Sequence, residues 1–116
     1  MNAKILIIED VKEMSQLISM YLQKEGIEVF EVETAELALE KLETWNCDLI
    51  ILDLNLPGMD GFEFLNKLRK KSNIPVVIVS ARDMDEDVIL ALGCGADEFV
   101  TKPFSPRVLV ARIRAL

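Results

Sequence analysis

Polar side chains follow four apolar runs of this chain, at the point where each run ends. These residues are, with the preceding apolar run in parentheses, Glu9 and Asp10 (4–8), Asp53 (49–52), Ser80 (76–79) and Lys102 (99–101). If these runs are parallel strands, their carboxyl ends lie along one edge of a sheet, where open α/β sheets bind their ligands. Three acids, one hydroxyl and one lysine would then converge there.

The three carboxylates of Glu9, Asp10 and Asp53 would repel one another strongly at short range, so their cluster calls for a cation. Hard oxygen ligands suit Mg²⁺, which takes one or two carboxylates and keeps water or phosphate oxygens as its other ligands. Asp53 is then a candidate nucleophile, because a carboxylate can attack a phosphoryl group to form an acyl phosphate. Lys102 and the metal would offset the charge on the phosphoryl oxygens, and Ser80 could donate a hydrogen bond to one of them.

Each of these residues also has an ordinary structural role. Acids that follow strands are common as helix caps and loop residues, and a single serine or lysine at such a place indicates less still. The functional interpretation depends on their joint placement at the ends of four strands. Asn55 and Arg82 flank the expected site, where they could tune the access of water.

Composition and charge exclude several classes of protein. The chain has 116 residues, of which 51% are hydrophobic, as expected for a single domain with one core. Its net charge of −7 argues against binding to a nucleic-acid backbone by this domain, because such binding needs a basic face. The sequence contains no histidine, so no Ser-His-Asp or Cys-His triad and no histidine-ligated metal can be built from it.

The location expected from the sequence is the cytoplasm. No apolar run approaches the roughly 20 residues needed to cross a bilayer, and the amino end shows no signal-peptide pattern. We therefore expect no membrane association. Cys47 and Cys94 lack CxxC spacing, so both are expected to be packing residues in a reducing compartment.

Apolar runs of four to six residues alternate with stretches of helical period, which predicts five βα units on a parallel sheet. The expected strands are 4–8, 28–32, 48–52, 75–80 and 98–101. The expected helices are 11–25, 35–45, 61–71, 84–92 and 105–116. The second strand is the most polar and should lie nearer an edge of the sheet. In the first helix, one stripe should face the sheet: Val11, Met14, Leu17, Ile18, Tyr21 and Leu22.

Local signals mark several helix ends. Gly26 is expected to end the first helix. The segment Asp60-Gly61-Phe62-Glu63 resembles a capping box at the start of the third helix, and Ser105 and Pro106 provide a cap and a first-turn proline for the fifth. These features are structural rather than functional.

Five segments together resemble the receiver domain of two-component response regulators. They are 7–10 (Ile-Ile-Glu-Asp), 53–61 (Asp-Leu-Asn-Leu-Pro-Gly-Met-Asp-Gly), 79–81 (Val-Ser-Ala), 95–97 (Gly-Ala-Asp) and 102–104 (Lys-Pro-Phe). The resemblance covers the whole chain, 1–116, as a single receiver domain. It implies a flavodoxin-like (βα)5 fold, which is a doubly wound, five-stranded parallel sheet of strand order 2-1-3-4-5.

The resemblance also implies roles for the residues of the site. Asp53 matches the phosphoacceptor, which takes a phosphoryl group from a partner histidine kinase. Glu9 and Asp10 match the family's acidic pair for Mg²⁺, and Asn55 matches the residue whose backbone carbonyl also binds the metal. Lys102 matches the site lysine, whose bond to the following proline is cis in the family.

Ser80 and Phe99 match the family's switch hydroxyl and switch aromatic. In the family, phosphorylation draws the hydroxyl toward the phosphoryl group and the aromatic follows inward, which remodels the face made by 84–92, 98–101 and 105–116. The implied function is therefore a signalling switch and not an enzyme. It would nevertheless support its own Mg²⁺-dependent phosphorylation and a slow dephosphorylation.

The segment 102–116 resembles the OmpR/PhoB subgroup, whose members carry a DNA-binding domain downstream. The chain would then be the N-terminal part of a longer regulator of transcription, and DNA would be bound by the other domain. Receivers of that subgroup form a two-fold homodimer through the same three elements. The positions that match this dimer face are Val88, Asp97, Glu98, Val108, Arg112 and Arg114.

Two ion pairs between subunits have matches in this chain: Glu98 with Arg112 and Asp97 with Arg114. A third pair departs from the pattern, because Val88 and Val108 stand where the subgroup has a basic and an acidic residue. Loss of both charges leaves no unpaired ion, and two valines can pack instead. We expect the dimer to persist with an apolar contact there; the alternative is a weakened or replaced dimer.

Three other functions share parts of this pattern. A phosphatase of the haloacid-dehalogenase type also uses an aspartate after a strand, but the second acid that it needs is replaced by Asn55. A flavin carrier would share the fold, but Glu9 and Asp10 would repel the flavin phosphate. A phosphorylation-independent interaction module of the same fold is the main alternative.

Overall fold

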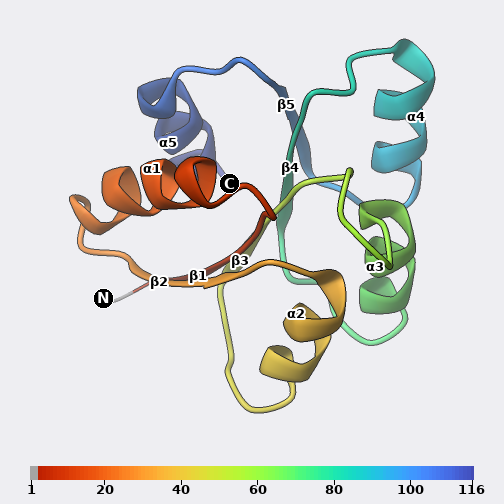
Figure 1. The fold of residues 1–116 in the computed structure, drawn as a ribbon, viewed down its shortest axis with the longest axis horizontal. Coiled ribbons are helices and arrows are strands. Elements are labelled where there is room, and N and C mark those ends of the chain that lie inside the picture. Colours follow the sequence, from red (N-terminus) through yellow and green to blue (C-terminus); the bar gives the residue numbers. More distant parts are fainter. Residues whose placement is uncertain (1–2) are drawn as a thin grey trace.

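The structure is a computed structural model and describes residues 3–116, in which five strands alternate with five helices (Figure 1). The strands are β1 (Lys4–Ile8), β2 (Glu28–Val32), β3 (Leu49–Leu52), β4 (Val76–Ser80) and β5 (Glu98–Thr101). The helices are α1 (Lys12–Gln23), α2 (Ala35–Leu42), α3 (Gly61–Arg69), α4 (Asp85–Gly93) and α5 (Pro106–Arg114). The strands form one parallel sheet of order β2-β1-β3-β4-β5, which confirms the expected flavodoxin-like fold and the edge position of β2.

Helices cover both faces of the sheet, as Figure 1 shows. On one face α1 and α5 pack against the strands through Ile18, Leu22 and Leu109. On the other face α2, α3 and α4 surround a core centred on Phe64, which is fully buried. Because successive side chains of a strand point to opposite faces, the central strands are apolar along most of their length, with Lys4 at the start of β1 and Ser80 at the end of β4 as the polar exceptions.

The strand register brings four carboxyl ends to one edge of the sheet. Ile8 of β1 pairs with Leu52 of β3, and Leu52 pairs with Ile78 of β4. At the far side of the sheet Ser80 of β4 pairs with Thr101 of β5. The segments that follow β1, β3, β4 and β5 therefore leave the sheet side by side.

Two helix starts have the predicted side-chain caps. The carboxylate of Asp60 accepts a hydrogen bond from the backbone N–H of Glu63 at 2.9 Å. The hydroxyl of Ser105 accepts one from the N–H of Val108 at 3.3 Å, directly before the proline-led first turn of α5. The predicted role of both cysteines in packing is also found, since Cys47 is buried and Cys94 is half-buried against the core.

The predicted apolar face of α1 is wrong in part. Val11 is 46% exposed and Leu17 is 37% exposed. Ser15 is buried instead, and its hydroxyl donates a hydrogen bond to the carboxylate of Glu31 on β2 at 2.5 Å. A polar residue can face the sheet here because the edge strand offers it a hydrogen-bond acceptor.

Gly61 allows α3 to begin directly against the segment that follows β3. Its N–H donates to the carbonyl of Leu54 at 3.0 Å. A Cβ atom at this position would lie 2.7 Å from the Cα of Leu54 and 2.8 Å from the carbonyl oxygen of Asp53, both closer than real Cβ contacts allow. The glycine therefore fixes how closely the helix approaches the backbone that carries Asp53.

We expect Gly61→Ala to lower the free energy of unfolding by about 1–3 kcal/mol, because the added methyl group must push the backbone of β3 and its loop away. Gly93→Ala is the matched control, since nothing lies within 4 Å of a Cβ there. The control should leave stability unchanged or raise it by about 0.4–1 kcal/mol. Urea denaturation of both variants tests this, and a Gly61→Ala protein as stable as the parent would contradict it.

Candidate functional site

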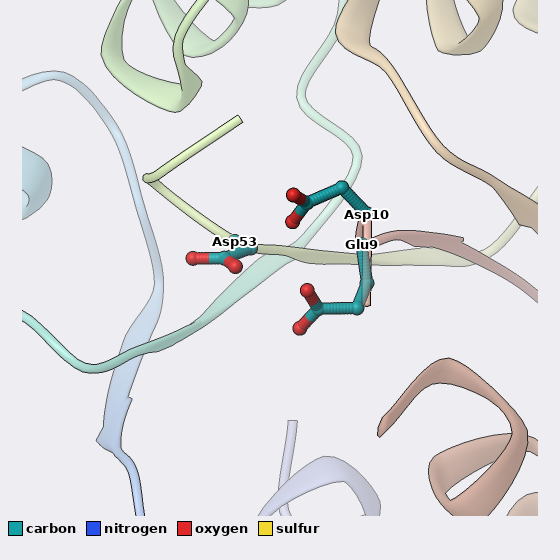
Figure 2. A group of neighbouring side chains, drawn as sticks. All are labelled: Glu9, Asp10 and Asp53. Atoms are coloured by element: carbon teal, nitrogen blue, oxygen red, sulfur yellow. The ribbon is translucent and has the colours of Figure 1, made fainter. Parts of the chain in front are cut away.

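Three carboxylates meet at the carboxyl edge of the sheet (Figure 2). Glu9 and Asp10 directly follow β1, and Asp53 directly follows β3, the neighbouring strand. One oxygen atom of each side chain lies within 4.8 Å of the others. Glu9 and Asp53 are buried, with 4% and 5% of their surface exposed, whereas Asp10 is exposed. The structure thus brings together the acids that the sequence placed at this edge.

Lys102 reaches the acidic cluster from the loop after β5. Its ammonium nitrogen lies 2.8 Å from an oxygen of Glu9 and 3.3 Å from an oxygen of Asp53. Its backbone N–H donates to the carbonyl of Ser80 at 2.8 Å, which ties the start of this loop to β4. The peptide bond between Lys102 and Pro103 is cis. The lysine is therefore the positive centre between the two buried acids.

Burial and ion pairing have opposing effects on the pKa values of Glu9 and Lys102. Burial raises the pKa of the Glu9 carboxyl above its usual value, and the hydrogen bonds from Lys102 and from the backbone of Val11 offset this only in part. Burial alone would lower the pKa of Lys102, but its hydrogen bond to Glu9 and the negative charge of Asp53 raise it instead. Lys102 therefore stays charged at neutral pH.

The donor set fits a Mg²⁺ ion. All three acids offer hard oxygen ligands, and one ammonium group does not neutralise three carboxylates. Both oxygens of Glu9 are already engaged, one with Lys102 and one with the N–H of Val11 at 3.1 Å. Among residues 3–116, by contrast, no hydrogen bond holds the exposed carboxylate of Asp10. A metal ion could therefore enter the site from solvent on the side of Asp10.

The backbone around Asp53 holds its side chain toward the cluster. The N–H of Asp53 donates to the carbonyl of Ile8 on β1 at 3.0 Å. One carboxylate oxygen accepts the N–H of Asn55 at 3.1 Å, and the other faces Lys102. The residue is thus oriented by the neighbouring strand and by the loop that follows it.

Ser80 and Phe99, the expected switch pair, lie on β4 and β5. Ser80 is fully buried at the end of its strand, and its hydroxyl oxygen accepts the N–H of Arg82 at 3.1 Å. Phe99 is partly buried and packs on the core beneath α2, α3 and α4. The hydroxyl therefore lies at the site edge, whereas the aromatic ring belongs to the face that α4 covers.

Sequence reasoning placed Arg82 and Asn55 beside the site but missed their contact. The guanidinium Nε of Arg82 donates to the side-chain oxygen of Asn55 at 2.7 Å. These residues follow adjacent strands, at 2 residues beyond Ser80 and 2 residues beyond Asp53. That shared offset is the signal that could have indicated the pair.

The residues expected at a dimer face lie on and around β5 and α5, and their charges have partners within the chain. Glu98 and Arg112 form an ion pair at 3.3 Å. Asp97 pairs with Arg69 of α3 at 3.2 Å, and Arg114 pairs with Glu25 beyond the end of α1. Val108 is 50% exposed, and Val88 is half-buried on α4. Within one chain Glu98 and Arg112 therefore pair with each other, whereas Asp97 and Arg114 pair with other residues, and the pairs expected between subunits stay a prediction.

Comparison with known protein families decides the class of the chain. Residues 5–114 match the family described as the response regulator receiver domain. The chain belongs to this family. The resemblance drawn from the sequence motifs is thereby confirmed, and the domain is a component of signalling rather than a classical enzyme.

Curated relatives and solved structures agree with this assignment. The chain is 43% identical to the sensory transduction protein RegX3 of Mycolicibacterium smegmatis over 112 residues, which cover 97% of this chain and 49% of that protein. It is 41% identical over 117 aligned residues to the alkaline phosphatase synthesis transcriptional regulatory protein PhoP of Bacillus subtilis, covering 100% of this chain and 49% of that protein. The receiver domain of the Francisella response regulator 1452 superposes with a TM-score of 0.93 at 36% identity, covering 98% of this chain and 95% of that one.

Two further findings concern the extent of the chain and its helices. The chain spans about half the length of the curated relatives that it matches. Within residues 3–116, no helix is long and apolar enough to cross a membrane. The relatives are regulators, which agrees with the OmpR/PhoB-like subgroup expected from the sequence.

We expect Lys102→Met to increase the stabilisation that Mg²⁺ confers on the domain. Without metal, removal of the ammonium group leaves Glu9 and Asp53 unpaired, which should lower the free energy of unfolding by roughly 3–5 kcal/mol. Mg²⁺ should then recover more stability than in the parent, because it no longer competes with the lysine for carboxylate oxygens.

Thermal unfolding with EDTA and with Mg²⁺ measures this difference. Lys67→Met is the matched control, because Lys67 is exposed near the end of α3 and forms no ion pair among the residues that the structure describes. Equal Mg²⁺-induced shifts in the melting temperatures of Lys102→Met, the control and the parent would show that the lysine does not compete with a metal.

Proposed function

We propose that this chain is a phosphoacceptor switch in which Asp53 takes a phosphoryl group from the phosphohistidine of a partner histidine kinase. The observation that supports this most directly is the setting of the Asp53 carboxylate. It is buried at the carboxyl edge of the sheet, 3.3 Å from the ammonium group of Lys102 and within 4.8 Å of two further acids. This is the setting that nucleophilic attack on a phosphoryl group requires.

In the transfer step, a carboxylate oxygen of Asp53 attacks the phosphorus atom. A bond forms between that oxygen and phosphorus, the bond between phosphorus and the imidazole nitrogen breaks, and the electron pair stays with the nitrogen. Lys102 offsets the charge on the phosphoryl oxygens. Glu9, Asp10, Asp53 and the backbone carbonyl of Asn55 would hold Mg²⁺, which would supply further charge neutralisation there.

We infer that phosphorylation acts by changing the conformation of the domain, and that Ser80 and Phe99 transmit this change from the site to the surface. The Ser80 hydroxyl can donate to a phosphoryl oxygen and move toward it. The Phe99 ring then follows inward on β5 and changes the face made by α4, β5 and α5. Physically this is a two-state element whose equilibrium is biased by a local charge.

We infer further that the domain controls transcription through a DNA-binding domain in the same protein, acting in the cytoplasm. The relative PhoP is a transcriptional regulatory protein of about twice the length of this chain. The net charge of −7 makes the receiver itself unsuitable for binding DNA. Its part would be to report phosphorylation to the effector domain.

The reporting step that we propose is homodimerisation through α4, β5 and α5. Two of these elements, α4 and α5, carry exposed apolar side chains: Ile89 (69%), Leu90 (52%) and Val108 (50%). Val88 and Val108 would supply an apolar contact in place of an ion pair. Glu98 with Arg112 and Asp97 with Arg114 would supply charged contacts between the subunits, which requires all four residues to exchange their partners within the chain for residues of the other subunit.

We expect Asp53→Asn to abolish phosphoryl uptake and leave the fold intact, because the nucleophile is lost while the side-chain volume is kept. With acetyl phosphate and Mg²⁺ the parent should gain about 80 Da, the mass of one phosphoryl group, and the variant should gain nothing. Intact-protein mass spectrometry measures this directly.

Asp48→Asn is the matched control, since Asp48 lies at the opposite end of the same strand. Its carboxylate accepts the N–H of Lys4 at 2.7 Å, and an asparagine oxygen can accept the same bond. This variant should be phosphorylated like the parent. A full adduct on Asp53→Asn would refute the assigned nucleophile, and the absence of any adduct on the parent would favour the phosphorylation-independent module.

We expect Val108→Glu to weaken the dimer of the phosphorylated domain by at least about tenfold, because a charge would be buried without a partner in the interface. A glutamate in the first turn of α5 is favourable for the helix itself, so the monomer should remain folded. Sedimentation measures the dimer constant. Met20→Glu, on the exposed side of α1, is the control, since Met20 is 46% exposed outside this face. A dimer constant unchanged by Val108→Glu would place Val108 outside the interface.

A further inference from the structure

One arginine links the two loops that border the site. Arg82, in the loop between β4 and α4, donates from Nε to the side-chain oxygen of Asn55 in the loop after β3, at 2.7 Å. Its Nη1 lies 3.4 Å from the carboxylate of Asp87 in the first turn of α4. Its guanidinium carbon lies 5.5 Å from the centre of the Phe62 ring in α3. The contacts join the stretch 82–87 to the stretch 55–62, and Arg82 and Asn55 are 27 residues apart in sequence.

The amino end of α4 is otherwise weakly attached. The helix buries a single residue, Ala91, which lies in its second half. The residue that precedes the helix, Met84, is 59% exposed and makes no side-chain cap. Its first turn carries three acids, Asp85, Glu86 and Asp87. The position of this end therefore depends on polar contacts from neighbouring loops, of which those of Arg82 reach toward the site.

Hydrogen bonds connect Arg82 to Asp53 through Asn55 and, separately, to the hydroxyl of Ser80 at the site edge. The N–H of Asn55 donates to a carboxylate oxygen of Asp53 at 3.1 Å, and the N–H of Arg82 donates to the hydroxyl of Ser80 at 3.1 Å. A hydrogen-bonded series thus runs from the Asp53 carboxylate through Asn55 and Arg82 to Asp87 on α4. A change at the carboxylate can act on this series at two points.

Phosphorylation of Asp53 would disturb both points. Hydrogen bonds to an ionised carboxylate are stronger than those to a neutral acceptor, so conversion to an acyl phosphate weakens the hold on the Asn55 loop. Movement of the Ser80 hydroxyl toward a phosphoryl oxygen draws the Arg82 backbone along or breaks its N–H bond. In either case the short bond between Arg82 and Asn55 opposes the movement.

We propose that Arg82 is a positioning residue that holds the β4–α4 loop and the first turn of α4 in the resting arrangement through its bond to Asn55, and that phosphorylation of Asp53 releases it. This rests on the proposed function of Asp53 as phosphoacceptor. The exposed ion pair with Asp87 stabilises little by itself. The bond to Asn55 carries the argument, because it joins two loops and is present only while they keep their resting distance.

The first test measures how tightly the domain binds beryllofluoride with Mg²⁺, a stable stand-in for the phosphoryl group, by fluorine NMR. Arg82→Ala should bind it about fivefold more tightly, because one hydrogen bond no longer opposes the switched arrangement. Asn55→Ala should have a similar effect, because it removes the side-chain oxygen that Arg82 binds and keeps the backbone carbonyl that is proposed to bind Mg²⁺. The double variant should bind no more tightly than either single variant, because both substitutions remove the same bond.

Arg107→Ala is the control, since Arg107 is exposed in the first turn of α5. It should bind beryllofluoride like the parent. Arg82→Lys should restore part of the opposition, because a lysine can donate to Asn55 but cannot also bind Asp87 through a planar fork. If Arg82 had a purely structural role, both Arg82→Ala and Arg82→Lys would bind beryllofluoride more weakly than the parent.

The second test needs no modification of Asp53. The amides of Asp87 and Val88 both donate to the carbonyl of Met84 and close the first turn of α4. Their hydrogen exchange should become several-fold faster in Arg82→Ala, and Arg107→Ala should leave it unchanged. This measurement tests whether Arg82 stabilises the first turn of α4 in the unphosphorylated domain, independently of phosphoryl chemistry.

The outcomes separate this proposal from the proposed function. A parent that binds beryllofluoride, with Arg82→Ala showing unchanged affinity and unchanged exchange, would overturn the role of Arg82 alone. Fully additive effects of Arg82→Ala and Asn55→Ala would overturn the pairing of these residues. A parent that neither binds beryllofluoride nor gains mass with acetyl phosphate would overturn the phosphoacceptor function and, with it, the release step.

Discussion

The pairing of one ammonium group with two buried carboxylates is the interaction on which the rest of this structure depends. Glu9 and Asp53 lose most of their contact with water, and Lys102 is the charge that compensates them at 2.8 Å and 3.3 Å. Such an arrangement is stable only if the backbone holds all three residues in place. The apolar strands β1, β3 and β4, buried on both faces, provide that rigid support.

The same cluster is left open to chemistry because its charges do not balance. Two acids share the lysine, and the third, Asp10, is exposed beside them. The excess negative charge favours a divalent cation, and the cation in turn favours a phosphoryl group. The site therefore combines one fixed positive group with an excess of negative charge. This combination suits the binding of a cation and a phosphoryl group better than a fully neutralised ion pair would.

Stability is distributed unevenly around this site. The backbone that carries Asp53 is held tightly, by the bond to Ile8 and by the close approach of α3 at Gly61. The α4 side is held loosely, since that helix buries only Ala91. Regions that move in a switch are drawn from the less stable parts of a fold. A rigidly held carboxylate beside a loosely attached helix is an arrangement in which a local change of charge can change the shape of the surface.

Local patterns in the sequence were enough to predict the five βα units, the edge of the sheet that carries the site and the acids, serine and lysine gathered there, whereas the strand order was expected only from the resemblance to receiver domains. Apolar runs of strand length predict strands, and parallel strands must end at a common edge. Which of these groups touch could be learned only from the three-dimensional fold. Lys102 and Glu9 are 93 residues apart, and Arg82 and Asn55 are 27 apart. The burial of Ser15 in place of Leu17, and the partners that Asp97 and Arg114 find within the chain, depend on distances between elements, which no local pattern contains.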